Sequence, residues 1–311
     1  MIITVTPNPA MDEGYTVSEL RPGRWFRAKD VNRSPGGRGI NASIVLKQLG
    51  YDSVATGFLA GFSGAYIRNN MLERGISTNF VNIKGENRTN TYIFEELGGL
   101  ETAVTDVGPT VYEDAQKRLM WNLDRLLPRA TAVLMGGSLP PGVPVGFFKD
   151  VINRVKRKNI PIYIDAFGKA LDLAIEALPT VVKIDHRFMN TIRGVDLSTL
   201  DHLIEISQKI FDEGVDWVIT SYFNHSNVFC TTKGFFLAEI KPERIFTFRS
   251  ANDALMAGMV VAREERMGLE DTIRFAMACV QENVRYAEKG VPSREAVDAA
   301  LGDICVEKIE R

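Results

Sequence analysis

The sequence predicts an α/β protein in three layers, with a central, mostly parallel β-sheet covered by helices on both faces and a small β-sheet lid. Three observations lead to this prediction. The chain opens on a β-branched run, residues 1–6, which is typical of a buried strand. Strands and helices alternate regularly beyond Gly108-Pro109. Two segments, residues 12–34 and 86–106, interrupt the alternation, and we expect them to form the lid of a single domain spanning residues 1–311.

Each element follows from its pattern of apolar residues and from the glycines and prolines that flank it. Pro7 and Pro9 end the first strand, because proline cannot donate to a sheet ladder. Gly50 ends a helix whose inward residues include Ile44 and Val45. Further strands are expected at residues 53–59, 79–83, 92–95, 131–135, 160–165, 181–185 and 217–221, with a short β-rich run at 244–248. Further helices are expected at residues 65–74, 111–127, 145–158, 171–178, 200–212 and 251–267.

Composition excludes several classes of protein. The formal net charge is −2, with 45% hydrophobic and 24% charged residues, which is typical of a globular protein and gives no reason to expect nucleic acid or an anionic membrane as a partner. Cys230, Cys279 and Cys305 are far apart, so we expect free thiols in a reducing compartment and neither a disulfide nor a protein metal site. No basic leader and no membrane-length apolar run is found, so we expect a cytoplasmic protein.

The chain is organised around residues 249–258, where a helix is expected to begin at an acid. Asp253 would lie beside the unpaired N–H groups and the positive dipole end of that helix. A carboxylate in this place can take a proton while anionic groups gather nearby. On these ten residues alone, however, a simple capping residue is the better explanation.

Other polar and glycine-rich positions fall at the same edge of the expected sheet. Ligands of parallel sheets bind beyond the carboxyl ends of the strands. The Pro-Gly-Gly-Arg-Gly-Ile-Asn run at residues 35–41 would let the backbone approach a ligand closely, although a plain tight turn explains it equally well. The residues expected at this edge are Asp12, Gly36, Gly137-Ser138, Asp165, Asp185 and Asp253.

Five short motifs occur in register along the chain. They are Thr-Val-Thr-Pro-Asn-Pro-Ala-Met-Asp at 4–12, Gly-Gly-Arg-Gly-Ile-Asn at 36–41, Gly-Phe-Leu-Ala-Gly-Phe-Ser-Gly at 57–64, Gly-Glu-Asn-Arg-Thr-Asn at 85–90 and Gly-Ser-Leu-Pro-Pro-Gly at 137–142. With them the chain resembles the pfkB, or ribokinase-like, carbohydrate kinases, in particular the branch of 1-phosphofructokinase and tagatose-6-phosphate kinase. The resemblance runs nearly end to end and implies a ribokinase-like fold.

The resemblance also implies the roles of individual residues in a sugar-phosphate kinase. Asp253 would be the catalytic base that deprotonates the acceptor hydroxyl as the γ-phosphoryl group of ATP arrives in line. Arg88 would grip the phosphate already on the sugar with paired N–H donors. Mg²⁺ would bridge the nucleotide phosphates, and two copies would pair through their lids, where Trp25 and Phe26 lie. The full substrate-binding set would be Asp12, Gly36, Gly37, Arg38, Asn41, Arg88, Asn90 and Ser138.

The nucleotide half departs from the family pattern. The Gly-Ala-Gly-Asp anion hole stands here as residues 250–253, Ser-Ala-Asn-Asp, so both glycines are replaced. The Asn-x-x-Glu motif aligns with residues 185–188, where Phe188 cannot replace the Glu. The Ser-Leu-Gly-Ala-x-Gly loop aligns with residues 221–226, which bring in aromatic bulk. The altered nucleotide-binding set is therefore Asp185, Ser221, Tyr222, Ser250, Ala251 and Asn252.

Three hypotheses remain open from the sequence. The chain is a kinase that uses ATP and Mg²⁺, a non-catalytic sugar-phosphate binder on the kinase fold (a pseudokinase), or a kinase with a changed donor such as pyrophosphate. The second follows from the loss of small residues around one ligand only. The discriminating observation is whether the side chains of Tyr222, Phe223 and Asn252 occupy the space that a nucleotide needs.

Overall fold

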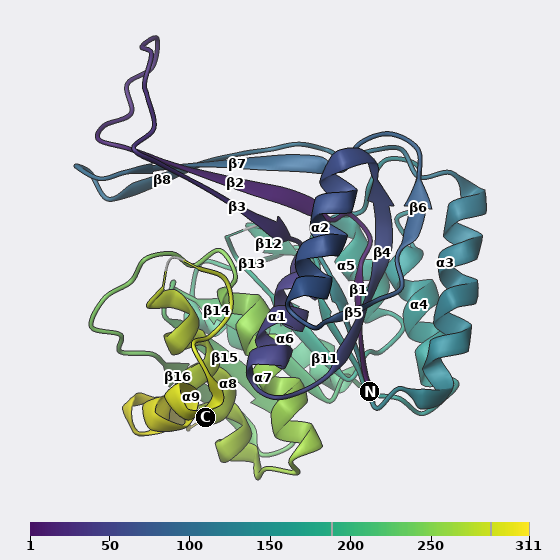
Figure 1. Ribbon diagram of the computed structural model, residues 1–311. Helices are drawn as coiled ribbons and strands as arrows, with labels where there is room; N and C mark the ends of the chain where they lie inside the picture. The colour runs from purple at the N-terminus through teal and green to yellow at the C-terminus, as the bar shows by residue number, and fades with distance from the viewer. Residues whose placement is uncertain (188, 287, 311) are drawn as a thin grey trace.

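The computed structural model describes residues 1–187, 189–286 and 288–310. Within these residues an eleven-stranded sheet runs through the molecule, and helices cover both of its faces (Figure 1). A second, four-stranded sheet lies across one end of the layers. The three-layer α/β/α architecture expected from the sequence is confirmed.

The large sheet is parallel over most of its width. In sheet order its strands are β17 (Cys305–Ile309), β16 (Gly234–Glu239), β15 (Ser226–Thr231), β14 (Trp217–Tyr222), β11 (Val181–Ile184), β10 (Ile162–Asp165), β9 (Ala132–Gly136), β1 (Ile2–Thr6), β4 (Ser53–Ala60) and β5 (Ser77–Thr78), with β6 (Val81–Ile83) also paired to β4. Pairing is parallel from β4 to β14 and antiparallel from β14 to β17. The carboxyl ends of the central strands therefore meet at one edge.

Alternate side chains of each strand point to opposite faces of the sheet, so each face carries its own core. Ile3 and Val5 belong to the core on one face, and Ile2 belongs to the core on the other. The first core is covered by α3 (Glu113–Leu126), α4 (Phe147–Lys156), α5 (Gly168–Ile175) and α6 (Leu200–Asp212). The second is covered by α1 (Arg38–Gln48), α7 (Ala251–Glu264), α8 (Leu269–Val284) and α9 (Arg294–Ala299), and α2 (Gly61–Glu73) packs with α1 against β4.

The second sheet, called the lid sheet below, combines the two segments that interrupt the βα alternation. Its order is β3 (Asp30–Gly36), β2 (Ala10–Val17), β7 (Arg88–Glu95) and β8 (Leu100–Thr105). Because β2 and β7 are parallel in this register, Asp12 lies beside Asn90. The other short elements are the hairpin of β12 (Thr191–Ile192) and β13 (Val195–Asp196), and the 3₁₀ turns η1 (Leu127–Arg129) and η2 (Ala300–Asp303).

Two stretches differ from the structure expected for them. The β-rich run at 244–248 forms no strand. Both edges of the preceding strand, β16, are already paired, with β15 and β17, and the run lines a cavity under the lid sheet instead. Helix α8 was not expected, because it is buried on almost all sides and lacks the polar face that marks a surface helix. None of the helices in the described residues is long and apolar enough to cross a membrane.

Candidate active site

The loops that follow the parallel strands carry polar side chains to the space beneath the lid sheet. Gly37 stands at the start of α1 with φ of +121°, and a side chain there would collide with the side chain of Thr6. Only glycine fits such a close, left-handed position. The turn places Arg38 and Asn41 in the first turn of α1, facing the ends of the strands.

Asp253 lies buried in the first turn of α7. Its Oδ2 accepts a hydrogen bond of 2.7 Å from Asn41 Nδ2, and its Oδ1 lies 3.5 Å from Nη1 of Arg38. The N-cap of α7 is Ser250, so Asp253 is not the capping residue. Burial raises the pKa of Asp253 to about 6, although the charge of Arg38 opposes the shift. A carboxyl group that titrates near neutrality suits general-base chemistry.

Arg38 joins Asp253 to a second buried carboxylate. Its Nε lies 3.3 Å from Oδ2 of Asp165, the last residue of β10. Burial lowers the pKa of this guanidinium, but the two carboxylates outweigh burial and raise the pKa overall. Arg38 therefore stays charged and keeps the negative charge of Asp253 compensated in a buried place.

A cavity of about 890 Å³, called the main cavity below, lies between the lid sheet and the strand ends. Its lining includes the expected base and all but one of the expected substrate-binding residues, namely Asp12, Gly37, Arg38, Asn41, Arg88, Asn90, Ser138 and Asp253. Gly36 is the exception. Gly36 packs so close to the carboxyl group of Asp12 that a side chain at position 36 would displace this carboxyl group.

Arg88 reaches the main cavity from the start of β7. Its Nε donates to the backbone oxygen of Asn8 at 3.1 Å, and its Nη1 lies 3.5 Å from Asn90 Oδ1 and from the backbone oxygen of Asp106. Burial lowers its pKa. All three acceptors are uncharged oxygens, so the positive charge of Arg88 is available to an anion in the cavity.

Two amide oxygens of the cavity wall lack partners. Asn8 Oδ1 and Asn41 Oδ1 are buried, and neither accepts a hydrogen bond from the described residues. Both residues line the main cavity, and their Nδ2 atoms are occupied by protein acceptors. Buried polar atoms nearly always have a partner, so these two oxygens are open to hydrogen bonds from the hydroxyl groups of a ligand in the cavity.

On the expected nucleotide side, three polar side chains bind one another. Asn252 Nδ2 donates to Asp185 Oδ2 at 2.7 Å, and Arg187 grips both oxygens of the same carboxylate at 2.6 to 3.0 Å. Although burial opposes it, these hydrogen bonds from Arg187 hold the pKa of Asp185 far below its usual value. The side chain at position 252 is therefore turned into the protein's own hydrogen-bond network.

The other residues of the expected nucleotide set are also held by the protein. Ser221 Oγ accepts from the buried Lys183 at 2.6 Å, and Ser250 Oγ accepts from Asn283 Nδ2 at 3.0 Å. Tyr222 packs against the hydrophobic core, while its neighbour Phe223 is 60% exposed. Phe188 lies outside the described residues. The main cavity is lined by none of the six expected nucleotide-binding residues, Asp185, Ser221, Tyr222, Ser250, Ala251 and Asn252.

Comparison with known proteins agrees with this geometry. Residues 10–295 match the pfkB family of carbohydrate kinases. The chain belongs to that family. It is 26% identical over 309 residues to the 1-phosphofructokinase of Bacillus subtilis (strain 168), which covers 99% of this chain and 100% of that protein.

Solved structures confirm the ribokinase-like fold of this pfkB-family chain. A possible 1-phosphofructokinase of Thermotoga maritima superimposes with a TM-score of 0.93 at 30% identity, over 99% of both chains. The Arabidopsis thaliana ribokinase complexed with ribose and ATP superimposes with a TM-score of 0.75 at 18% identity, over 96% of this chain and 98% of that one.

Asp185 does not fit as a direct ligand of the Mg²⁺ ion that membership of the pfkB family implies. Both of its oxygens already accept N–H groups from Arg187, and Mg²⁺ needs near-octahedral oxygen ligands. Among the described residues, no cluster of three or more His, Cys, Asp or Glu side chains could hold a metal ion. The guanidinium group of Arg187 thus occupies the carboxylate oxygens that a metal ion would need.

Three basic residues of this site were not singled out from the sequence. Lys183 is fully buried on β11, and burial lowers its pKa to about 8. Arg249 lies 4.4 Å from the ring centroid of Tyr92 and so links the start of α7 to the lid sheet. Lys289 donates a hydrogen bond to Asp12, which is 277 residues away in the sequence. A lysine inside an apolar strand is unusual, so Lys183 could have been recognised from the sequence as a candidate site residue. The sequence around the other two residues gives no such indication.

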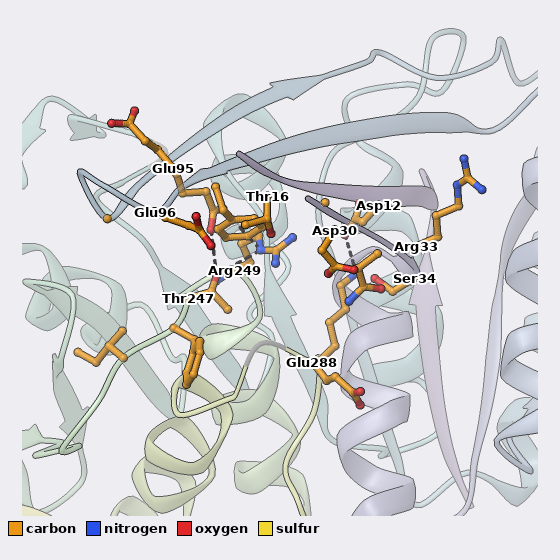
Figure 2. A pocket seen from close by; sticks show the side chains of 18 of the residues that line it. Asp12, Thr16, Asp30, Arg33, Ser34, Glu95, Glu96, Thr247, Arg249 and Glu288 are labelled. Atoms are coloured by element: carbon orange, nitrogen blue, oxygen red, sulfur yellow. Dashed lines mark hydrogen bonds and ion pairs between the residues drawn. The ribbon is translucent and has the colours of Figure 1, made fainter. Parts of the chain in front are cut away.

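A second cavity of about 510 Å³, called the side cavity below, adjoins the main cavity under the lid sheet. The two cavities share Asp12, Arg249 and Lys289 in their walls. Figure 2 shows the side cavity, with Arg249 and Thr247 at one end and Asp12 above the loop that carries Glu288 at the other. Asp12, Arg249 and Lys289 therefore stand at the border between the main cavity and the side cavity.

Proposed function

We propose that this chain is a sugar-phosphate kinase of the 1-phosphofructokinase or tagatose-6-phosphate kinase type, which transfers the γ-phosphoryl group of ATP to a hydroxyl of a phosphorylated ketohexose. The observation that carries the proposal is one cavity that contains both Asp253, with its raised pKa, and Arg88, whose partners are neutral oxygens. The first offers a base for a hydroxyl and the second a site for a phosphate. The relatives named as 1-phosphofructokinases support the same acceptor class.

In the proposed step, Asp253 takes the proton of the acceptor hydroxyl. The oxygen of that hydroxyl forms a bond to the γ-phosphorus atom of ATP at the same time. The bond from that phosphorus to the bridging oxygen breaks, and ADP leaves with the electron pair. Asn41 and Arg38 orient the carboxylate, and the N–H groups at the start of α7 stabilise the transferred charge. With a pKa of about 6, Asp253 is mostly ionised at neutral pH and still basic enough to accept a proton.

The acceptor would lie along the main cavity, with its phosphate on Arg88 and its reacting hydroxyl on Asp253. Asn8 Oδ1 and Asn41 Oδ1 would accept hydrogen bonds from its hydroxyl groups, which removes two unsatisfied buried atoms. Asp12, held by Asn90 at 2.7 Å, would accept another. Gly37 and Ser138 would border the sugar without adding charge.

A non-catalytic sugar-phosphate binder is the alternative that the donor side raises, because Asp185, Arg187 and Asn252 are already bound to one another. The comparisons give this alternative no support. The buried Asp253, with its raised pKa and its contacts to Asn41 and Arg38, supports a transfer reaction instead. We therefore keep ATP-dependent transfer as the proposal.

The test is an assay of three acceptors, fructose 1-phosphate, fructose 6-phosphate and tagatose 6-phosphate, each with MgATP or with pyrophosphate. We expect turnover with MgATP and at least one acceptor. Heat on titration with a sugar phosphate, together with no turnover and no heat with MgATP, would contradict the kinase proposal and favour the binder. Turnover with pyrophosphate alone would establish a changed donor.

We further propose a homodimer through the lid sheets in a reducing cytoplasm. Apolar side chains gather on the exposed lid, namely Trp25, Phe26, Leu97, Leu100 and Val104. Exposed apolar patches on a small sheet favour a self-complementary contact. Cys230 and Cys279 are buried free thiols, which supports a reducing compartment. Sedimentation of Trp25→Ser should then show a shift towards monomer.

A further inference from the structure

Lys289, which follows α8, reaches the base of the lid sheet and is almost fully covered. Its Nζ donates to Asp12 Oδ2 at 2.5 Å and to the backbone oxygen of Pro35 at 2.6 Å, and its side chain is 9% exposed. Burial lowers its pKa, and the charge of Asp12 opposes that shift. An ammonium group is rarely buried without a specific use, because its desolvation is costly.

The ammonium group has one donor more than the described part of the chain uses. A lysine carries three N–H donors, and the described residues supply two acceptors, Asp12 and Pro35. Lys289 also lines the main cavity together with Asp253 and Arg88. The third donor therefore remains for an oxygen atom of a ligand in that cavity.

Asp12 and Lys289 form a matched acceptor and donor. The Oδ1 atom of Asp12 accepts from Asn90 and its Oδ2 atom from Lys289, which fixes the carboxylate while leaving lone pairs on both oxygens. A carboxylate beside an ammonium group can bind two neighbouring sugar hydroxyl groups. One hydroxyl donates a hydrogen bond to the carboxylate, and the oxygen of the other accepts one from the ammonium group. Neither group alone would fix the orientation of both.

The backbone after Lys289 is anchored to the machinery of the proposed reaction. The carbonyl of Gly290 accepts from Asn283 Nδ2 at 2.8 Å, and that side chain also contacts Ser250, the N-cap of α7. The N–H of Val291 donates to Gln48 Oε1 at 2.9 Å, at the end of α1. The segment that carries Lys289 is thus anchored to α1, which carries Asn41, and to α8, whose Asn283 also bonds the N-cap of α7.

We propose that Lys289 is a substrate-positioning residue, which donates a hydrogen bond to a sugar oxygen next to the hydroxyl held by Asp12. The inference rests on the proposed function, because it takes the occupant of the main cavity to be a sugar phosphate. A purely structural lysine, which only ties the 288–291 segment to the lid sheet, would affect folding and leave the acceptor's affinity alone. The two roles therefore differ in what a substitution changes.

The experiment compares the wild type with Lys289→Met, Lys289→Arg and, as a matched control, Lys29→Met, an exposed lysine that pairs with Glu96 on the lid. Each protein is titrated with fructose 1-phosphate, fructose 6-phosphate and tagatose 6-phosphate, and KM and kcat are measured with each acceptor that is turned over. We expect Lys289→Met to raise the KM for the sugar phosphate about tenfold to a hundredfold, as loss of a charge-assisted hydrogen bond does. The KM for ATP, and all constants of Lys29→Met, should be unchanged.

Lys289→Arg keeps the charge but not the point geometry of the ammonium group, so its KM should fall between those of the wild type and Lys289→Met. This variant decides the question if the methionine variant does not fold. An unchanged KM for the sugar phosphate in a folded variant, with only the melting temperature lowered, would overturn the inference. If the wild type shows no turnover, the kinase proposal fails by itself. Weaker binding of sugar phosphate by Lys289→Met in the titration would still support the inference.

Discussion

The two halves of the site differ in how much hydrogen-bonding capacity they leave unused. On the acceptor side, Arg88 has only neutral partners and Asn41 Oδ1 has none among the described residues, so the cavity offers unused hydrogen-bonding capacity. On the donor side, Asp185 is bound by Arg187 and Asn252. A hydrogen bond to an unsatisfied protein group contributes fully to the free energy of ligand binding. Where an internal hydrogen bond must be broken first, only the difference between the two bonds contributes. We infer that the acceptor side is preorganised and that donor binding requires an exchange of partners.

Removal of the base should have the largest effect. Asp253→Asn keeps the shape and the hydrogen bond with Asn41 but cannot take a proton, so kcat should fall by about a hundredfold to ten-thousandfold. The affinity for sugar phosphate, measured by titration, should change little because Arg88 is untouched. The control is Asp114→Asn, an exposed acid on α3. Turnover equal to the wild type would exclude Asp253 as the base.

The acceptor half is tested by Arg88→Met. Loss of the guanidinium should raise the KM for the sugar phosphate about tenfold to a hundredfold, because a charged hydrogen bond is lost. Affinity for the same sugar without its phosphate should not change. Arg118→Met, at an exposed position on α3, is the matched control. If both forms of the sugar lose affinity equally, Arg88 does not bind the phosphate.

The pH dependence tests the link between Arg38 and the base. The proposed base, Asp253, has a pKa of about 6, so kcat should be level above neutrality and fall as the pH drops through 6. Arg38 lowers the pKa of Asp253, so Arg38→Met should move this acid limb to higher pH. The phosphate of the substrate titrates in the same pH range, but this titration affects the pH profiles of the wild type and of Arg38→Met equally. An unmoved limb would show that Arg38 does not act on the base.

The residues expected on the acceptor side line one cavity, and most of them could be named from the sequence because they lie in local motifs. Gly37, Arg38 and Asn41 belong to one turn of α1, and the glycine that this turn requires is visible in the sequence. The regular alternation of buried strands and helices likewise predicted the parallel sheet. Physical determinants that are local in sequence can be recognised without coordinates.

Contacts between distant segments could not be predicted in this way. The partner of Asp12 is Lys289, and nothing near either residue announces the pair. The run at 244–248 has the composition of a strand, but β17 from the end of the chain occupies the available sheet edge. Arg187 meets Asn252 only because β11 and the start of α7 converge. These outcomes depend on tertiary competition rather than on local preference.

The smallest effect is expected from opening the donor side. Asn252→Gly removes one donor from Asp185, so less internal bonding must be exchanged when ATP binds. One net hydrogen bond corresponds to a decrease in the KM for ATP of about twofold to tenfold, with the KM for the sugar phosphate unchanged. Asn159→Gly, in the exposed turn after α4 and away from the site, controls for the flexibility of glycine. A KM for ATP that stays the same or rises would mean that the bonds of Asp185 survive donor binding. The two halves of the site would then be equally preorganised, and the contrast between them would not extend to function.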